Sequence, residues 1–152
     1  MKVEIDKKPA LKIAGRAFEI NNRKDARDIR QRFFEEYEDR CLKDLGAGYG
    51  LMEYDALHQI YKYFIGFEIS DQDLIDELGF DIKEIAESLY LEIPIDGFDL
   101  EEGYSYTYEE FFPNKKYFHN IGPDVEYFQY DDSENEIGNV SLNISLMENP
   151  HK

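Results

Sequence analysis

Tyr49-Gly-Leu-Met-Glu-Tyr-Asp55 is repeated in outline by Val125-Glu-Tyr-Phe-Gln-Tyr-Asp131, which begins 76 residues later, half the length of the 152-residue chain. Both stretches end in an aromatic residue followed by aspartate. An internal repeat on this scale indicates two structural units built to one plan. The same offset carries a strand expected at 61–69 onto 137–145, which is again a strand candidate.

Each half is expected to fold as strand, helix, strand, strand. In the first half we expect strands at 12–20, 49–54 and 59–69, and a helix over 26–45 with apolar residues every four positions. In the second half we expect strands at 88–93, 125–130 and 139–146, and a helix over 100–111 that stops at Pro113. The acidic segment 70–80 has helical spacing, which predicts a short helix between the halves.

These elements predict one α+β domain over residues 1–152, formed by two βαββ units with pseudo-twofold symmetry. The first repeat covers about 1–70, a linker about 71–84, and the second repeat about 85–148. We expect an antiparallel sheet with the helices on one face and a ligand groove at the centre.

The charge of the chain restricts its partners. Acidic residues number 34 and basic residues 17, so the formal charge is −17. Such a surface repels nucleic-acid phosphates and anionic membranes, and it attracts cationic ligands or a protein partner with a basic surface. The N-terminus has no apolar signal-peptide region, and the single cysteine excludes a disulfide within the chain. We therefore expect a cytoplasmic protein that binds neither nucleic acid nor membrane directly.

Aromatic residues are unusually frequent, with 12 tyrosines, 11 phenylalanines and no tryptophan. The strand expected at 61–69 carries aromatic side chains on both faces, so one face can pack under helices while the other lines a concavity. Tyr90 shares a strand face with Glu92, and Glu126 shares one with Phe128 and Tyr130. Tyrosine rings beside a carboxylate suit an organic cation, through cation–π attraction and opposite charge.

Catalytic and metal motifs are weak by comparison. The histidines at 58, 119 and 151 lie far apart, without cysteine or carboxylate at ligand spacing, so we expect no metal site. The sequence contains no glycine-rich phosphate loop and no nucleophile elbow. We therefore assign no catalytic residue and no cofactor, and expect a binding protein rather than an enzyme.

Three further motifs carry a family resemblance. They are Ile85-Ala-Glu-Ser-Leu-Tyr-Leu-Glu-Ile-Pro-Ile-Asp-Gly97, Phe111-Phe-Pro-Asn-Lys-Lys-Tyr117 and Gly122-Pro-Asp-Val-Glu-Tyr127. In this order and spacing, together with Tyr63-Phe-Ile-Gly66, they resemble the GyrI-like effector-binding domains. Such domains also occur behind DNA-binding modules in AraC-type and MerR-type regulators. The resemblance covers nearly the whole chain and implies the two-unit fold already inferred.

The resemblance also implies a central groove that binds lipophilic, often cationic, compounds against aromatic residues and a glutamate. It carries Tyr63, Tyr90, Phe111 and Glu126 over as pocket residues. With the residues chosen by pattern, the predicted ligand-binding set is Tyr63, Phe67, Tyr90, Glu92, Tyr108, Phe111, Glu126 and Tyr130. Ser141 stands where relatives often carry a glutamate, so the charge partner of the ligand is left open between Glu126, Glu92 and Glu68.

The function expected from these observations is binding of lipophilic, cationic organic compounds or drugs by a stand-alone bacterial domain. It would act in transcription-regulator-like sensing or in drug sequestration. Two alternatives stay open. One is hydrolysis of reactive xenobiotic molecules by a pocket glutamate acting as general base. The other, suggested by the family name, is inhibition of an enzyme such as DNA gyrase through its basic surface.

Overall fold

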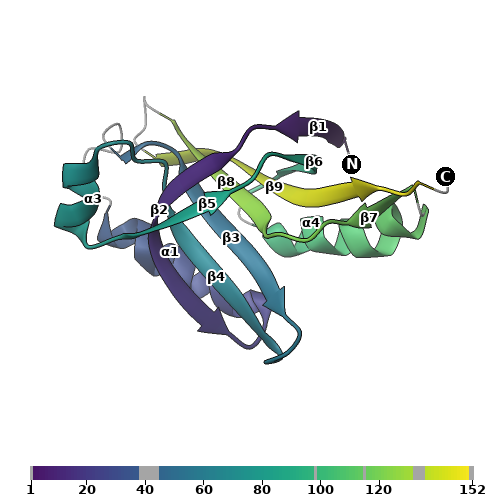
Figure 1. The fold of residues 1–152 in the computed structure, drawn as a ribbon, viewed down its shortest axis with the longest axis horizontal. Coiled ribbons are helices and arrows are strands. Elements are labelled where there is room, and N and C mark those ends of the chain that lie inside the picture. Colours follow the sequence, from purple (N-terminus) through teal and green to yellow (C-terminus); the bar gives the residue numbers. More distant parts are fainter. Residues whose placement is uncertain (1, 38–44, 98, 115, 132–135, 151–152) are drawn as a thin grey trace.

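One antiparallel sheet organises the molecule. The computed structural model describes residues 2–37, 45–97, 99–114, 116–131 and 136–150. Within them nine strands form an open sheet in the order β1-β6-β9-β8-β3-β4-β2-β5, and the short β7 pairs with β9 (Figure 1). The strands are β1 (Glu4–Lys8), β2 (Leu11–Ile20), β3 (Gly48–Asp55), β4 (Ile60–Phe67), β5 (Asp81–Ile85), β6 (Ser88–Ile95), β7 (Tyr117–His119), β8 (Asp124–Asp131) and β9 (Glu136–Glu148).

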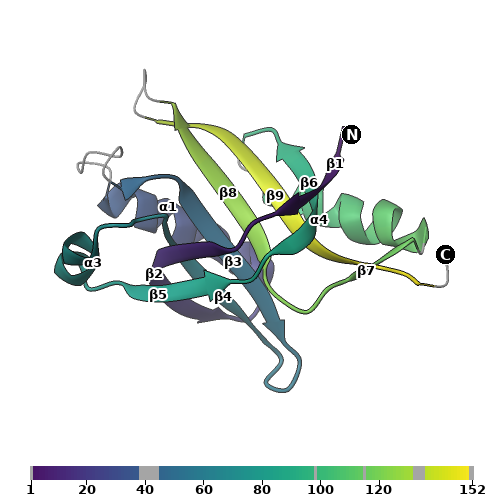
Figure 2. The same cartoon turned by 45° about the horizontal axis from the view of Figure 1, so that its top comes forward.

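Three α-helices and three shorter helical segments accompany this sheet in the described residues. The α-helices are α1 (Ala26–Glu36), α3 (Gln72–Leu78) and α4 (Leu100–Tyr106). The segment η1 (Arg23–Asp25) leads into α1, whereas η2 (Thr107–Phe111) and η3 (Phe112–Asn114) continue α4. Figures 1 and 2 show α1 and α4 on the same side of the sheet, one against each half. None of these helices is long and apolar enough to cross a membrane.

The strand order displays the two-unit symmetry. Reading outward from the central pair β3 and β8, β4 corresponds to β9, β2 to β6, and β5 to β1. In that central pair Gly50 lies opposite Glu126, and these two residues are 76 positions apart, the offset of the internal repeat. The pseudo-twofold axis therefore passes between Gly50 and Glu126.

Two of the helices, α1 and α4, each pack against one half of the sheet and cover an apolar core there. Under α1, Phe33 and Tyr37 pack with Tyr63, Ile65 and Phe67 of β4. Under α4, Leu100 and Tyr104 pack with residues of the second half, namely Leu91, Ile93, Phe128, Leu142 and Ile144. A third cluster lies on the opposite face and contains Ile13, Leu51, Phe64, Tyr90 and Val125. Near this cluster β2 pairs with β5 through its first half and with β4 through its second half (Figure 2).

The structure confirms the α+β class and the antiparallel sheet with its helices. It differs from the predicted elements at the sheet edges, where β1, β5 and β7 were not expected. The edge strands β1 and β5 are mostly exposed along their whole length, so they lack the alternation that marks a half-buried strand. Because of β5, the predicted linker over 71–84 is largely structured.

The observed helices also differ from the predicted ones. The helix predicted over 26–45 is observed as α1 up to Glu36, and residues 38–44 lie outside the described part of the chain. The helix predicted over 100–111 widens to a π-type turn in η2, beginning at Thr107. At that point the Thr107 hydroxyl donates a hydrogen bond to the carbonyl oxygen of Gly103 at 2.8 Å.

Candidate functional site

Two neighbouring cavities lie on the helix side of the sheet, and Arg23 lines both. We call them together the groove. The Glu126 cavity, of about 610 Å³, is lined by Arg23, Lys24, Arg27, Arg30, Asp99, Leu100, Glu101, Tyr104 and Glu126. The Asp124 cavity, of about 320 Å³, is lined by Arg23, Met52, Glu53, Tyr54, Tyr61, Tyr108, His119, Gly122 and Asp124. Asp124 and Glu126 are two residues apart on β8, which places both carboxylates on one face of the sheet.

Glu126 lies at the floor of the groove with 0% of its surface exposed. Its Oε1 accepts a hydrogen bond from the Tyr63 hydroxyl at 2.6 Å and from the Arg30 guanidinium at 3.2 Å. Its Oε2 has no hydrogen-bond partner among the described residues, and neither does the buried Tyr104 hydroxyl. A polar atom buried without a partner is costly, and these two atoms keep a hydrogen-bonding capacity that no described residue uses.

Gly50 makes this arrangement sterically feasible. A Cβ atom on Gly50 would lie 2.4 Å from Oε1 of Glu126 and 2.5 Å from the Tyr63 hydroxyl oxygen. The two halves are thus unlike where the pseudo-twofold axis passes, because one supplies the glutamate and the other the glycine that leaves room for it.

The buried groups around Glu126 have shifted ionisation. Burial, and then the Glu126 carboxylate, raises the pKa of Tyr63 well above its ordinary value. Burial and Glu126 act in the same order on Tyr104 and also raise its pKa well above the ordinary value. Burial opposes the charge of Arg30, but the Glu126 carboxylate and the Tyr63 hydroxyl outweigh it and raise the pKa of Arg30. Both tyrosines therefore stay protonated as hydrogen-bond donors, and Arg30 stays cationic.

The Asp124 cavity combines a second buried carboxylate with tyrosine rings. Asp124 is 5% exposed, and its Oδ1 lies 2.8 Å from Nε2 of His119. The hydrogen bond to Asp124 outweighs partial burial and raises the pKa of His119 above its ordinary value. The Tyr54 and Tyr61 ring centroids are 4.9 Å apart on the β3–β4 hairpin. Burial, followed by the Asp124 carboxylate, raises the pKa of Tyr108 to about 12.

Arg23 lines both cavities and contacts a tyrosine of each. Its guanidinium lies 4.3 Å from the centroid of the Tyr104 ring and 5.6 Å from that of Tyr108. It also forms an ion pair with Glu101 at 3.6 Å. Tyrosine rings in the groove therefore already hold one cation of the protein itself, in the geometry of a cation–π contact.

Among the predicted site residues, Tyr108 and Glu126 line the groove. Tyr63 donates a hydrogen bond to Glu126 but lines neither cavity. Phe67 instead lies in the core under α1, 5.4 Å from the Phe33 ring centroid, and lines neither cavity. Phe111 is half-buried against the Tyr117 ring and likewise lines neither cavity.

Two further predicted residues belong to the opposite face of the sheet. Tyr90 packs there in the third core cluster, and Glu92, two residues along β6, forms an ion pair with Lys8. Glu68, the third candidate for the charge partner, is exposed. The side chain of Tyr130 lies outside the described part of the structure.

Several groove residues were not predicted from the sequence. Asp124 had a usable signal, because it stands two positions before Glu126 and strand alternation places it on the same face. Tyr54 and Tyr61 flank the predicted hairpin turn. Arg30 had a weaker signal: it lies one position from the predicted apolar residue Ile29, yet with 6% exposure it belongs to the buried face of α1.

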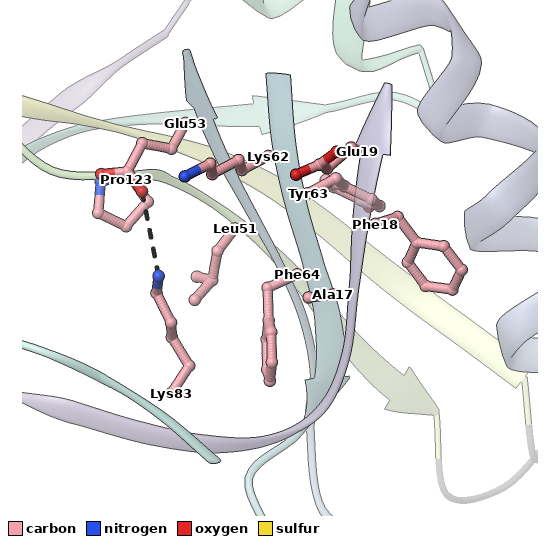
Figure 3. A pocket seen from close by; sticks show the side chains of 10 residues that line it. All are labelled: Ala17, Phe18, Glu19, Leu51, Glu53, Lys62, Tyr63, Phe64, Lys83 and Pro123. Atoms are coloured by element: carbon pink, nitrogen blue, oxygen red, sulfur yellow. Dashed lines mark ion pairs between the residues drawn. The ribbon is translucent and has the colours of Figure 1, made fainter. Parts of the chain in front are cut away.

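A third cavity, of about 460 Å³, lies at β2, β3, β4 and β5. Figure 3 shows Leu51 and Phe64 pointing into it, with the Lys83–Glu53 ion pair at its rim. Its acidic residues, Glu19 and Glu53, are not buried. It therefore lacks the buried carboxylates that distinguish the groove. Nowhere in the described residues do three or more histidine, cysteine, aspartate or glutamate side chains gather as a metal site would require.

The fold has relatives among solved structures. SAV2435, solved with tetraphenylphosphonium bound, superposes with a TM-score of 0.72 and 16% identity over 97% of this chain and 94% of that one. The integron cassette protein VCH_CASS2 of Vibrio cholerae gives 0.63 and 13% over 95% of each chain. The EcmrR C-terminal domain gives 0.60 and 8% over 97% of this chain and 98% of that one.

The sequence itself identifies the family. No curated protein matches the chain in sequence. The family model of integron-associated effector-binding proteins, Cass2, matches residues 4–146 and so includes both halves of the sheet and the whole groove. The chain therefore belongs to the Cass2 family of integron-associated effector-binding proteins, a GyrI-like family.

Proposed function

We propose that this protein binds lipophilic, cationic organic compounds in the groove and acts as a sensor or sequestering domain for them. One observation carries the proposal: the floor of a tyrosine-lined groove holds two buried carboxylates, Asp124 and Glu126, on the same face of β8. A buried carboxylate supplies charge, and tyrosine rings supply apolar surface and cation–π attraction. Together they suit a cation too lipophilic to be well solvated by water.

The comparisons support the class of ligand and the kind of role. The match to an effector-binding family favours a small molecule as the bound partner. SAV2435, which shares the fold, was solved with tetraphenylphosphonium, a lipophilic cation. Tetraphenylphosphonium is therefore a rational first probe for this chain.

The test is a calorimetric titration with tetraphenylphosphonium and with tetraphenylborate, which has the same shape and the opposite charge. We expect saturable binding of the cation and binding of the anion weaker by at least about tenfold, since a buried carboxylate repels it. Equal affinity for both ions, or no saturable binding of the cation, would refute the proposal.

A pair of variants locates the site. Tyr108 lines the groove and is 45% exposed, whereas Phe118 is 43% exposed and lines neither cavity. Tyr108→Ala should weaken tetraphenylphosphonium binding by roughly threefold to tenfold, the loss of one cation–π contact. Phe118→Ala is the matched control and should bind as the unmodified protein does. The reverse pattern would place the ligand elsewhere.

Hydrolysis is the second candidate, favoured by the Oε2 atom of Glu126, which lacks a hydrogen-bond partner among the described residues and belongs to a cavity-lining side chain. From that position a carboxylate can accept a proton from an attacking water molecule. Mass spectrometry after incubation with a reactive cyclopropane-bearing compound tests this activity. Turnover lost in Glu126→Gln would support it, and unchanged compound at stoichiometric protein would exclude it for that substrate.

A further inference from the structure

The two buried carboxylates of the groove differ in what already neutralises them. Glu126 is paired with Arg30 at 3.2 Å, and the two side chains are 1% and 7% exposed. A guanidinium carries its charge at every physiological pH, so this pair is permanently neutral. Asp124 is paired with His119 at 2.8 Å, and a histidine loses its charge within the physiological range. Of these two carboxylates, only Asp124 therefore has a counter-charge that is lost when the pH rises.

The net charge of the lining residues also differs between the two cavities. The Glu126 cavity is lined by four basic side chains and three acidic ones. The Asp124 cavity is lined by one arginine, two carboxylates and His119. With His119 neutral, the lining of the Asp124 cavity carries one net negative charge, whereas that of the Glu126 cavity carries one net positive charge. A cation is accordingly favoured in the Asp124 cavity and disfavoured in the Glu126 cavity.

The aromatic walls also favour the Asp124 cavity. Tyr54, Tyr61 and Tyr108 line it, and Tyr54 and Tyr108 are 53% and 45% exposed. Exposed tyrosine faces can receive a ligand without first losing packing in the core. In the Glu126 cavity the one tyrosine in the lining is Tyr104, and its ring already holds the guanidinium of Arg23 at 4.3 Å.

We propose that Asp124, and not Glu126, receives the positive charge of the ligand, in a cage formed by Tyr54, Tyr61 and Tyr108, and that protonation of His119 opposes binding. This proposal rests on the proposed function and specifies its chemistry. When His119 is protonated, it neutralises Asp124 and itself repels an incoming cation. When His119 is neutral, Asp124 is free to pair with the ligand. Protein protonation and cation binding are then competing events, so each weakens the other.

Charged and titratable groups face the His119–Asp124 pair from each neighbouring element. On the groove side they are Arg23 from η1, Glu53 and Tyr54 from β3, Tyr61 from β4 and Tyr108 from η2. On the other face of the sheet, the Asp124 carboxylate acts on Tyr90 from β6. Burial followed by Asp124 raises the pKa of both Tyr90 and Tyr108, which keeps them neutral. Around neutral pH, His119 is therefore the group in this set whose charge changes.

The experiment is a calorimetric titration with tetraphenylphosphonium at pH 6.0 and pH 8.5, because this cation has no titratable group. The protein is compared with His119→Gln, Asp124→Asn and the control His58→Gln. His58 is a matched control since its ring also contacts an aspartate, Asp55, at 2.7 Å, but it lines neither cavity. Asp124→Asn keeps the size of the side chain and an oxygen to accept the hydrogen bond from the Ser145 amide.

We expect the unmodified protein and His58→Gln to bind more weakly at pH 6.0 than at pH 8.5, by up to about tenfold for each pH unit below the His119 pKa. His119→Gln should bind equally at both pH values. Asp124→Asn should bind about tenfold more weakly than the unmodified protein at pH 8.5. Its affinity should depend less on pH, because His119 loses the carboxylate that raises its pKa.

The proposal would be overturned if the unmodified protein bound equally well at both pH values. It would also be overturned if Asp124→Asn bound as tightly as the unmodified protein. A pH dependence that persists in His119→Gln would also overturn it. If Asp124→Asn fails to fold, the pH profiles of the unmodified protein and of His119→Gln decide alone. The proposed function itself fails differently, by absence of tetraphenylphosphonium binding at either pH.

Discussion

Replacing Arg30 with methionine should cost the fold about 3 kcal/mol, because the change leaves a carboxylate buried without its counter-charge. In the structure Arg30 is 6% and Glu126 0% exposed, and the two are 3.2 Å apart. Methionine retains most of the apolar stem of arginine, so the loss reports on charge more than on packing. Arg27→Met, one turn earlier on the exposed side of α1, is the control and should change stability by less than about 0.5 kcal/mol.

The magnitude follows from the surroundings of Glu126. Breaking a buried ion pair by removing one partner costs about 3–5 kcal/mol. The lower end applies because Tyr63 still donates its hydrogen bond to the carboxylate at 2.6 Å. Glu126→Gln should cost about as much, since it leaves the Arg30 guanidinium uncompensated. The double variant, which lacks both charges, should lose less stability than the sum of the two single losses. The difference, the coupling energy, should be at least about 2 kcal/mol.

Urea denaturation followed by circular dichroism measures these losses. With a slope of about 1–3 kcal/mol per molar urea, a loss of about 3 kcal/mol lowers the midpoint by roughly 1–3 M. Domains of this size have a total stability of about 5–15 kcal/mol, so the single variants should stay folded enough to measure. Single losses below about 1 kcal/mol that add up in the double variant would refute the buried ion pair.

Three further predictions concern the groove. Gly50→Ala should destabilise the protein by about 1–3 kcal/mol in thermal denaturation, because its Cβ would lie 2.4 Å from Oε1 of Glu126; an unchanged melting temperature would contradict this. Arg30→Met should strengthen tetraphenylphosphonium binding, since Glu126 then faces the cavity uncompensated; unchanged or weaker affinity in calorimetry would count against the charge argument. His119 has a raised pKa, so its stabilising contribution is present below its unfolded pKa of about 6.5 and is lost as pH rises through the folded pKa. Melting temperatures from pH 5.5 to 9 should reveal that decline, and His119→Gln should remove it.

The fold was predictable because the two halves repeat the same local sequence patterns. The offset of 76 residues that relates Tyr49–Asp55 to Val125–Asp131 also relates Gly50 to Glu126 across the central strand pair. The edge strands were not predictable by the same means, because β1 and β5 are mostly exposed and have no buried face to impose alternation.

The groove was predictable only in part. Glu126, with its hydrogen-bond partner Tyr63, followed from motifs on strands whose neighbours could be inferred. Phe67 and Tyr90 did not reach the groove, because aromatic residues on both faces of the sheet do not reveal which face is packed and which is open. The pairing of Arg30 with Glu126 joins residues 96 positions apart in the sequence, so it depends on how α1 lies against β8 and cannot be read from local spacing.

A crystal structure of the protein with tetraphenylphosphonium, prepared above the pH at which His119 loses its proton, would locate the bound cation directly. We expect the cation in the groove, with its phosphorus nearer to the carboxylate of Asp124 than to that of Glu126 and its phenyl rings against Tyr54, Tyr61 and Tyr108. A cation seated on Glu126 with Arg30 displaced, or bound in the cavity over Leu51 and Phe64, would contradict it.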